Sequence, residues 1–172
     1  MISEEYAEQN RRLHAQEKYY GSFGGKWAPA VLQLCTTHET MDVLDYGCGK
    51  ATLNLQLPFS IHSYDPAIRK YSDSPSRADI VVCTDVMEHV EPEYTLDVLD
   101  ALRDLTAKVL LVNIATRAAE KTLPDGRNAH LVVEKASWWL ERLEQRFIVL
   151  KHEATEEDLT AICAPLVQDE NV

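Results

Sequence analysis

Short apolar runs alternate with stretches of helical periodicity along most of this 172-residue chain. The apolar runs predict strands at 42–46, 60–64, 79–84, 108–115, 147–152 and 159–164. Helical spacing or composition predicts helices at 3–18, 26–36, 50–56, 91–106 and 134–145. Strands that alternate with helices are typical of a mostly parallel sheet covered by helices on both faces, which is a three-layer αβα sandwich.

The last two predicted strands have no helix between them, so we expect an antiparallel hairpin at the C-terminal edge of the sheet. A single α/β domain over residues 1–172 is expected, with its core at 40–165. Residues 1–36 are expected to form a helical lid or cap. In the run 19–27, aromatic side chains could close over a ligand while glycines act as a hinge. Alternatively, these aromatic side chains simply pack on the sheet.

Composition narrows the class of protein. The chain has 17 Lys and Arg against 28 Asp and Glu, a net charge of −11. This argues against general nucleic-acid binding, because a phosphate backbone is held by clustered basic residues. The four cysteines form no C-x-x-C pair, which favours free thiols in a reducing cytoplasm over zinc or disulfides. The polar N-terminus resembles no signal peptide, and no apolar run approaches the roughly 20 residues of a membrane span.

A glycine turn after the first predicted strand carries the main chemical signal. Residues 42–51 read Asp-Val-Leu-Asp-Tyr-Gly-Cys-Gly-Lys-Ala, and Asp65 ends the second predicted strand. Glycines let the backbone approach a ligand, and the carboxylate of Asp65 can accept both hydroxyls of a ribose. Asp45 would repel a pyrophosphate but hold an ammonium, which favours S-adenosylmethionine over NAD. The glycine pattern alone is equally consistent with an ordinary strand-to-helix turn.

These residues resemble motifs of the class I S-adenosylmethionine-dependent methyltransferases. Residues 43–49 look like the first motif of that family, 64–65 like the second, and 78–90 like its fourth strand and the helix start that follows. The resemblance covers roughly residues 40–165 and implies a Rossmann-like fold with S-adenosyl-L-methionine as cofactor. The cofactor-binding residues that it implies are Asp45, Tyr46, Gly47, Gly49, Asp65, Pro66, Thr84, Asp85 and Val86.

The chain departs from the family between Asp65 and Ala78, where twelve residues leave too little room for the usual helix, strand and adenine-contacting loop. We therefore expect a trimmed sheet edge. Arg69, Tyr71 or Ser76 could contact the adenine instead.

Acidic and imidazole side chains gather near the end of the strand at 79–84. Asp85, Glu88 and His89 are spaced so that they project from one side of a helical turn. His130 ends the 116–130 loop, which opens onto the same sheet edge. Glu88, His89 and His130 could hold one divalent ion, Mg²⁺ or another metal. The Glu-His pair with a later histidine resembles metal-using small-RNA 2′-O-methyltransferases and a quinone-biosynthesis O-methyltransferase.

Two alternatives to a metal stay open for this cluster. His89 or His130 could act as a metal-free general base or contact the substrate. The acids could also simply cap the following helix, with His89 as a structural neighbour.

We therefore expect a methyltransferase that uses S-adenosylmethionine to methylate a small molecule or nucleotide, with Glu88, His89 and His130 as the catalytic residues. An O-methyl transfer is expected. The alternatives are a metal-independent N-methyltransferase and a catalytically inactive, cofactor-binding partner subunit. A nicotinamide-dependent oxidoreductase is disfavoured by Asp45 and by the lack of a second nucleotide-binding half.

Overall fold

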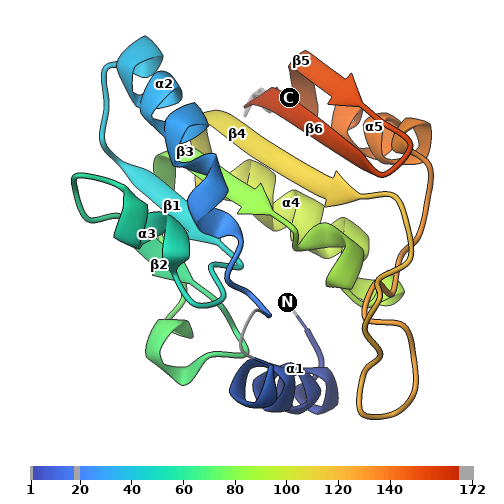
Figure 1. The fold of residues 1–172 in the computed structure, drawn as a ribbon. Coiled ribbons are helices and arrows are strands. Elements are labelled where there is room, and N and C mark those ends of the chain that lie inside the picture. The colour runs from blue at the N-terminus through green and yellow to red at the C-terminus, as the bar shows by residue number, and fades with distance from the viewer. Residues whose placement is uncertain (1, 18–19, 167–172) are drawn as a thin grey trace, which may run out of the picture.

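Six strands form one mixed sheet in the order β2-β1-β3-β4-β6-β5 (Figure 1). The computed structural model describes residues 2–17 and 20–166. The parallel strands are β1 (Val43–Tyr46), β2 (His62–Tyr64), β3 (Ala78–Thr84) and β4 (Thr106–Ala115). The antiparallel edge hairpin is β5 (Phe147–Ala154) and β6 (Asp158–Pro165), and β6 pairs with β4. The predicted mostly parallel sheet with an antiparallel C-terminal hairpin is confirmed.

Helices cover both faces of this sheet. One face carries α2 (Ala28–His38), α3 (Thr52–Gln56) and the 3-10 turn η1 (Gly24–Trp27). The other face carries α4 (Thr95–Leu105) and α5 (Ala136–Glu144). The remaining α-helix, α1 (Glu4–Gln16), lies beyond the end of the sheet toward which the arrows of β1 and β3 point (Figure 1). The three-layer αβα sandwich is thus confirmed, with α1 outside the layers.

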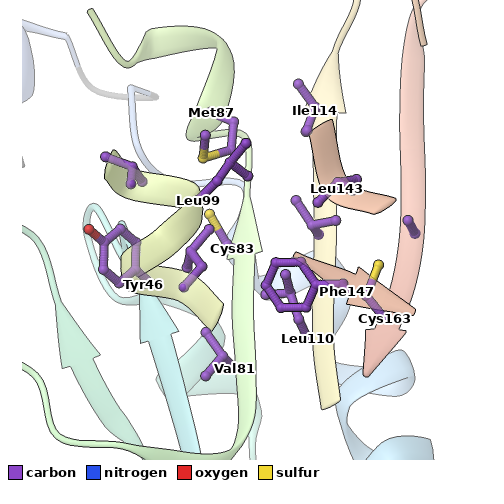
Figure 2. Packing of buried hydrophobic residues seen from close by; sticks show 14 of the residues in the cluster. Tyr46, Val81, Cys83, Met87, Leu99, Leu110, Ile114, Leu143, Phe147 and Cys163 are labelled. Carbon is purple, nitrogen blue, oxygen red and sulfur yellow. The ribbon is translucent and has the colours of Figure 1, made fainter. Parts of the chain in front are cut away.

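The larger part of the core lies between the sheet and the α4–α5 layer (Figure 2). Val81 and Cys83 of β3 face this cluster, whereas Ile80 and Val82 face the cluster under α2 and α3. All four side chains are fully buried. A strand that is buried on both faces has no solvent-exposed side, so its sequence is a continuous run of apolar residues. Each such side chain contributes about 1.5–3 kcal/mol to the stability of the fold.

The helix predicted at 91–106 starts later than expected. A 3-10 turn, η4 (Pro92–Tyr94), precedes α4, and the buried side of α4 is formed by Thr95, Val98, Leu99 and Leu102. Leu96 is 47% exposed. Because it follows Thr95 by one residue, it points about 100° around the helix from the buried side. Leu96 therefore lies off the buried face of α4.

The sheet edge next to β2 is shortened, as predicted. Between Asp65 and Ala78 the structure has a single 3-10 turn, η2 (Arg69–Tyr71), and this described segment contains no strand. The backbone N–H of Asp65 donates to the carbonyl of Tyr71 at 2.8 Å, which folds the segment back against the end of β2. β2 is therefore an edge strand.

The thiol and helix predictions also have clear outcomes. Cys35, Cys48, Cys83 and Cys163 are free and buried, as expected. Across residues 2–17 and 20–166, no helix has the length and apolar character needed to cross a membrane.

Ser3 caps α1, since its Oγ accepts a hydrogen bond from the Tyr6 N–H at 3.1 Å. The predicted end of that helix, near Lys18, falls outside the described residues, as does Tyr19 of the 19–27 run.

Replacing Glu39 by glycine should stabilise the fold. Glu39 follows α2 in the left-handed conformation, with φ of 50°, and its side chain is exposed. Glycine adopts this conformation without the Cβ penalty, so the free energy of unfolding should rise by about 0.5–1 kcal/mol. Urea denaturation measures the change. Glu39→Ala is the control and should give no gain; equal effects of the two substitutions would contradict the argument.

Candidate active site

A cavity of about 550 Å³ opens at the carboxyl ends of the parallel strands. Its walls come from the glycine turn after β1, the residues after β3, the 116–130 loop and α1. Eleven of the sequence-predicted site residues line it: Asp45, Gly47, Gly49, Asp65, Pro66, Thr84, Asp85, Val86, Glu88, His89 and His130. The volume is in the range of about 300–1,000 Å³ that small-molecule sites occupy.

Tyr46 is the one predicted cofactor residue whose side chain lies elsewhere. Figure 2 shows it in the core beside Leu99 and Cys83, and it is not among the residues that line the cavity. Successive side chains of a strand point to opposite faces, so Asp45 and Tyr46 cannot both face the cavity. The backbone of Tyr46 leads into the glycine turn. Arg69, Tyr71 and Ser76, considered for adenine, do not line the cavity either.

The glycine turn requires glycine at two positions because other backbone and side-chain atoms lie against it. Gly47 and Gly49 have φ of 79° and 52°. A Cβ on Gly47 would collide with Val86, and one on Gly49 would lie 2.5 Å from the carbonyl oxygen of Gly21. Ala51, where the family places a third glycine, also has a positive φ, 53°, just before α3. The two glycines therefore allow Val86 and Gly21 to lie directly against the turn.

Asp65 ties the glycine turn to the end of β2. Its Oδ2 accepts from the Gly49 N–H at 3.1 Å, and its Oδ1 accepts from the Ala67 N–H at 2.9 Å. Each carboxylate oxygen has two lone pairs, so each can accept one further hydrogen bond. Asp65 can thus organise the turn and still receive the hydroxyls of a ribose.

Asp45 is a buried carboxyl group with an unused hydrogen-bonding atom. Its Oδ2 is shielded from solvent and has no hydrogen-bond partner. Burial, reinforced by the nearby charge of Asp65, raises the pKa of Asp45 to about 7. A carboxyl group in this state favours a positively charged ligand, because such a ligand would restore its ionised form.

Glu88, His89 and His130 form a compact trio in the cavity wall. Each offers one ligand atom, and the three atoms lie within 4.8 Å of one another. Glu88 Oε1 accepts from the Ala115 N–H at 3.0 Å, while its buried Oε2 has no partner. Burial raises the pKa of Glu88 to about 7.

Backbone carbonyls fix which nitrogen of each histidine faces the cavity. His89 Nδ1 lies 2.7 Å from the Ala129 oxygen, and His130 Nδ1 lies 2.6 Å from the Arg117 oxygen. Since a carbonyl only accepts, both Nδ1 atoms carry the proton, and both Nε2 atoms are left as acceptors or metal ligands. Burial lowers the pKa of both rings, which favours their neutral forms.

The helix α1 is attached to the body across the cavity. Glu91, which is buried, accepts from the Ser3 N–H at 2.8 Å and from the Ser3 hydroxyl at 2.7 Å. Near the middle of the helix, Gln9 Nε2 donates to Asp125 at 2.9 Å. These contacts fix both the N-terminus and the central turns of α1.

The inner side of α1 supplies cavity residues that the sequence interpretation missed. Tyr6, Asn10 and His14 line the cavity, and Leu13 packs with Tyr6 in a small apolar cluster. The signal was the spacing: Tyr6, Asn10 and Leu13 recur at the helical interval of three and four residues. The sequence analysis expected a helical lid or cap over residues 1–36 but named none of these side chains. Tyr20 follows, and its hydroxyl donates to Asn10 at 2.7 Å.

Asp45→Asn should change how stability depends on pH. A raised pKa means that the folded protein binds the proton more tightly than the unfolded chain, so the contribution of Asp45 is lost as the pH rises toward about 7. From roughly pH 5 to 7, wild type should lose up to about 1.4 kcal/mol of unfolding free energy per pH unit relative to Asp45→Asn. Urea denaturation of both proteins checks this. Parallel pH profiles would show that the group is not perturbed.

Comparisons with known proteins agree with this geometry. Residues 16–164 match the family model described as a methyltransferase domain. The sequence has no significant match among curated proteins. The structure resembles magnesium protoporphyrin IX methyltransferase from Synechocystis PCC 6803 with bound SAM, with a TM-score of 0.62 at 12% identity, covering 96% of this chain and 100% of that one.

Two other structures are similar to a comparable degree. One is the 1,6-didemethyltoxoflavin-N1-methyltransferase of Burkholderia thailandensis, with a TM-score of 0.61 at 14% identity, covering 96% of this chain and 91% of that one. The other is the N-methyltransferase NodS of Bradyrhizobium japonicum WM9, with a TM-score of 0.60 at 13% identity, covering 93% and 98%. Identities this low show a shared fold. The family match spans most of the chain, and the chain therefore belongs to the methyltransferase-domain family and is a class I S-adenosylmethionine-dependent methyltransferase.

Proposed function

We propose that this enzyme transfers the methyl group of S-adenosylmethionine to a hydroxyl oxygen of a small molecule or nucleotide, with a divalent metal bound by Glu88, His89 and His130. The observation that carries the proposal is the trio itself, with three ligand atoms within 4.8 Å in the cavity wall. The rest of the cavity supports the cofactor part of the proposal.

The donor set fits a metal ion. Glu88 Oε2 is buried without a partner, and the two Nε2 atoms are unprotonated because Nδ1 of each ring donates to a carbonyl. Ligand atoms around one ion with bonds near 2.1 Å lie about 3–4 Å apart, so small side-chain rotations would complete the site. Two imidazoles and one carboxylate suit a transition metal such as Mn²⁺, Fe²⁺ or Zn²⁺ better than Mg²⁺.

The cofactor would be held at the glycine turn. In the proposed complex Asp45 receives the α-ammonium group, and Asp65 receives the ribose hydroxyls with its remaining lone pairs. Gly47 and Gly49 shape the turn, since a Cβ at Gly47 would meet Val86 and one at Gly49 would meet Gly21. Thr84 and Val86, at the end of β3, line the same part of the cavity.

Methyl transfer asks the protein chiefly for alignment. The sulfonium is already an activated leaving group, so the acceptor oxygen must be held in line with the methyl carbon and sulfur. A metal bound by the trio would lower the pKa of the acceptor hydroxyl and fix its oxygen. The α1 helix would act as the lid, because its docked position puts Tyr6 and Asn10 in the cavity wall and keeps water out.

A small acceptor suits the cavity better than a polymer. Cofactor and acceptor must share about 550 Å³ when α1 is docked. The net charge of −11 disfavours an extended phosphate backbone. The similar structures named for magnesium protoporphyrin IX and 1,6-didemethyltoxoflavin are also enzymes of small-molecule methylation.

A metal-independent N-methyl transfer is the second candidate. Burial lowers the pKa of His89 and of His130, so both rings are neutral bases that could remove a proton from an acceptor. Two of the similar structures are named as N-methyltransferases. This candidate needs no ligand at Glu88 Oε2, whereas the metal site gives that atom a partner.

Glu88→Gln should abolish metal binding while leaving the cofactor site intact. Glutamine can still accept from the Ala115 N–H, but it lacks the anionic oxygen, so Mn²⁺ affinity should fall by at least about 100-fold. Calorimetric titration of Mn²⁺ into the protein with bound S-adenosylhomocysteine measures this. His130→Ala should also lose Mn²⁺ binding. Its matched control is His152→Ala, because His152 is an exposed histidine on β5.

The outcomes separate the candidates. Loss of Mn²⁺ binding in Glu88→Gln and His130→Ala, together with methyl transfer that a chelator suppresses, supports the metal-assisted O-methyltransferase. Methyl transfer that is unaffected by chelators and persists in Glu88→Gln would contradict the metal-assisted mechanism and support the metal-independent enzyme. Cofactor binding without turnover of any acceptor would point to an inactive partner subunit.

A further inference from the structure

Lys26 and Asp85 face each other across the glycine-turn end of the cavity. Lys26 Nζ lies 3.3 Å from Asp85 Oδ2, and both residues line the cavity. The two side chains are 53% and 38% exposed. The pair therefore stands at the solvent-accessible wall of the cavity, where an entering ligand can reach both charges.

The backbone holds each partner in place. Asp85 has a φ of 56°, a conformation that a non-glycine residue rarely adopts, and its N–H donates to the Asn113 carbonyl at 3.1 Å. Strained residues of this kind concentrate at functional sites. On the other side, Lys26 belongs to η1, which is anchored to the start of α3 because the Gly25 N–H donates to Thr52 Oγ1 at 3.1 Å.

The charges at this end of the cavity are unbalanced. Asp45 and Asp65 lie in the same wall, so with Asp85 three carboxyl groups accompany the ammonium of Lys26. Among the cavity-lining residues that the structure describes, the remaining lysine and arginine side chains are Lys121 and Arg117. Both come from the 116–130 loop and are paired with glutamates. Among these cavity-lining cations, Lys26 is thus the one whose ion-pair partner, Asp85, also lines the cavity.

We propose that Lys26 binds the α-carboxylate of S-adenosylmethionine, and that this carboxylate replaces Asp85 as the partner of Lys26. The inference rests on the cofactor part of the proposed function, in which Asp45 holds the α-ammonium. The amino-acid end of the cofactor carries one positive and one negative group on the same carbon, so its site needs an anion beside a cation. Asp85 is the present partner of Lys26, and the ligand's carboxylate would take over that role.

The exchange is energetically undemanding. A partly exposed ion pair contributes little net stability, because solvent competes for both charges. The ligand's carboxylate gives Lys26 an equivalent partner, and Asp45 gains a cation at the same time. Lys26 therefore selects for ligands that keep the amino-acid carboxylate.

Two ligands isolate this contribution. S-adenosylhomocysteine carries the amino-acid end, whereas 5′-methylthioadenosine has the same adenosine and thioether sulfur without it. Calorimetric titration of both into wild type and Lys26→Met should show that the substitution weakens S-adenosylhomocysteine binding by up to about fivefold, the upper range for a partly exposed ion pair, and leaves the affinity for 5′-methylthioadenosine unchanged. Lys108→Met removes a comparably exposed ion pair, with Asp79, outside the cavity and should change neither affinity.

Asp85→Asn tests the replacement itself. Asparagine tolerates the left-handed backbone and removes the competing charge, so S-adenosylhomocysteine should bind equally well or up to about fivefold tighter. Weaker binding in Asp85→Asn, or an unchanged ratio of the two affinities in Lys26→Met, would overturn the inference while the cofactor assignment stands. Failure of wild type to bind S-adenosylhomocysteine would overturn both. Thermal melting confirms that each variant is folded.

Discussion

The close approach of backbone segments at the end of β1 is the constraint on which the rest of the site depends. Gly47 lies against the Val86 side chain, so the end of β1 is held at contact distance from the residues that follow β3. Gly49 lies against Gly21, and the Lys50 N–H donates to the Gly21 carbonyl at 2.7 Å. The first contact joins the two central strands, and the second joins the N-terminal segment to them. These two contacts position the glycine turn relative to the end of β3 and to the segment that leads into η1.

The buried carboxyl groups of the cavity lower the stability of the fold but favour the binding of positive charge. Burial raises the pKa of Asp45 and of Glu88 to about 7, which means that both carboxyl groups would ionise more readily in water. Their unpaired buried oxygens cost stability as long as no partner is present. A cationic ligand would remove that cost at Asp45, as a metal ion would at Glu88. The same desolvation that lowers the free energy of unfolding therefore strengthens the binding of positive charge.

The sequence was most informative where one physical rule decides the outcome. The apolar run at 80–83 predicted a strand, which the structure buries on both faces, and the glycine turn and Asp65 meet at the carboxyl edge of the parallel strands. Tertiary context decided the rest. Docking against Glu91 and Asp125 makes a charged helix, α1, one wall of the cavity. No local pattern encodes such long-range contacts.

Glu88 shows how structure and chemistry share one residue. Its backbone oxygen accepts from the Leu131 and Val132 N–H groups at 2.7 and 3.1 Å, while its Oε1 accepts from Ala115. The residue thus links the turn after β3 both to the end of β4 and to the segment that follows His130. This bracing brings the two histidines together, because His89 adjoins Glu88 and His130 adjoins Leu131. Glu88 lines the cavity with Oε2 unpaired and its other oxygens held by these hydrogen bonds, and such support is the condition for orienting a metal ion or an acceptor with precision.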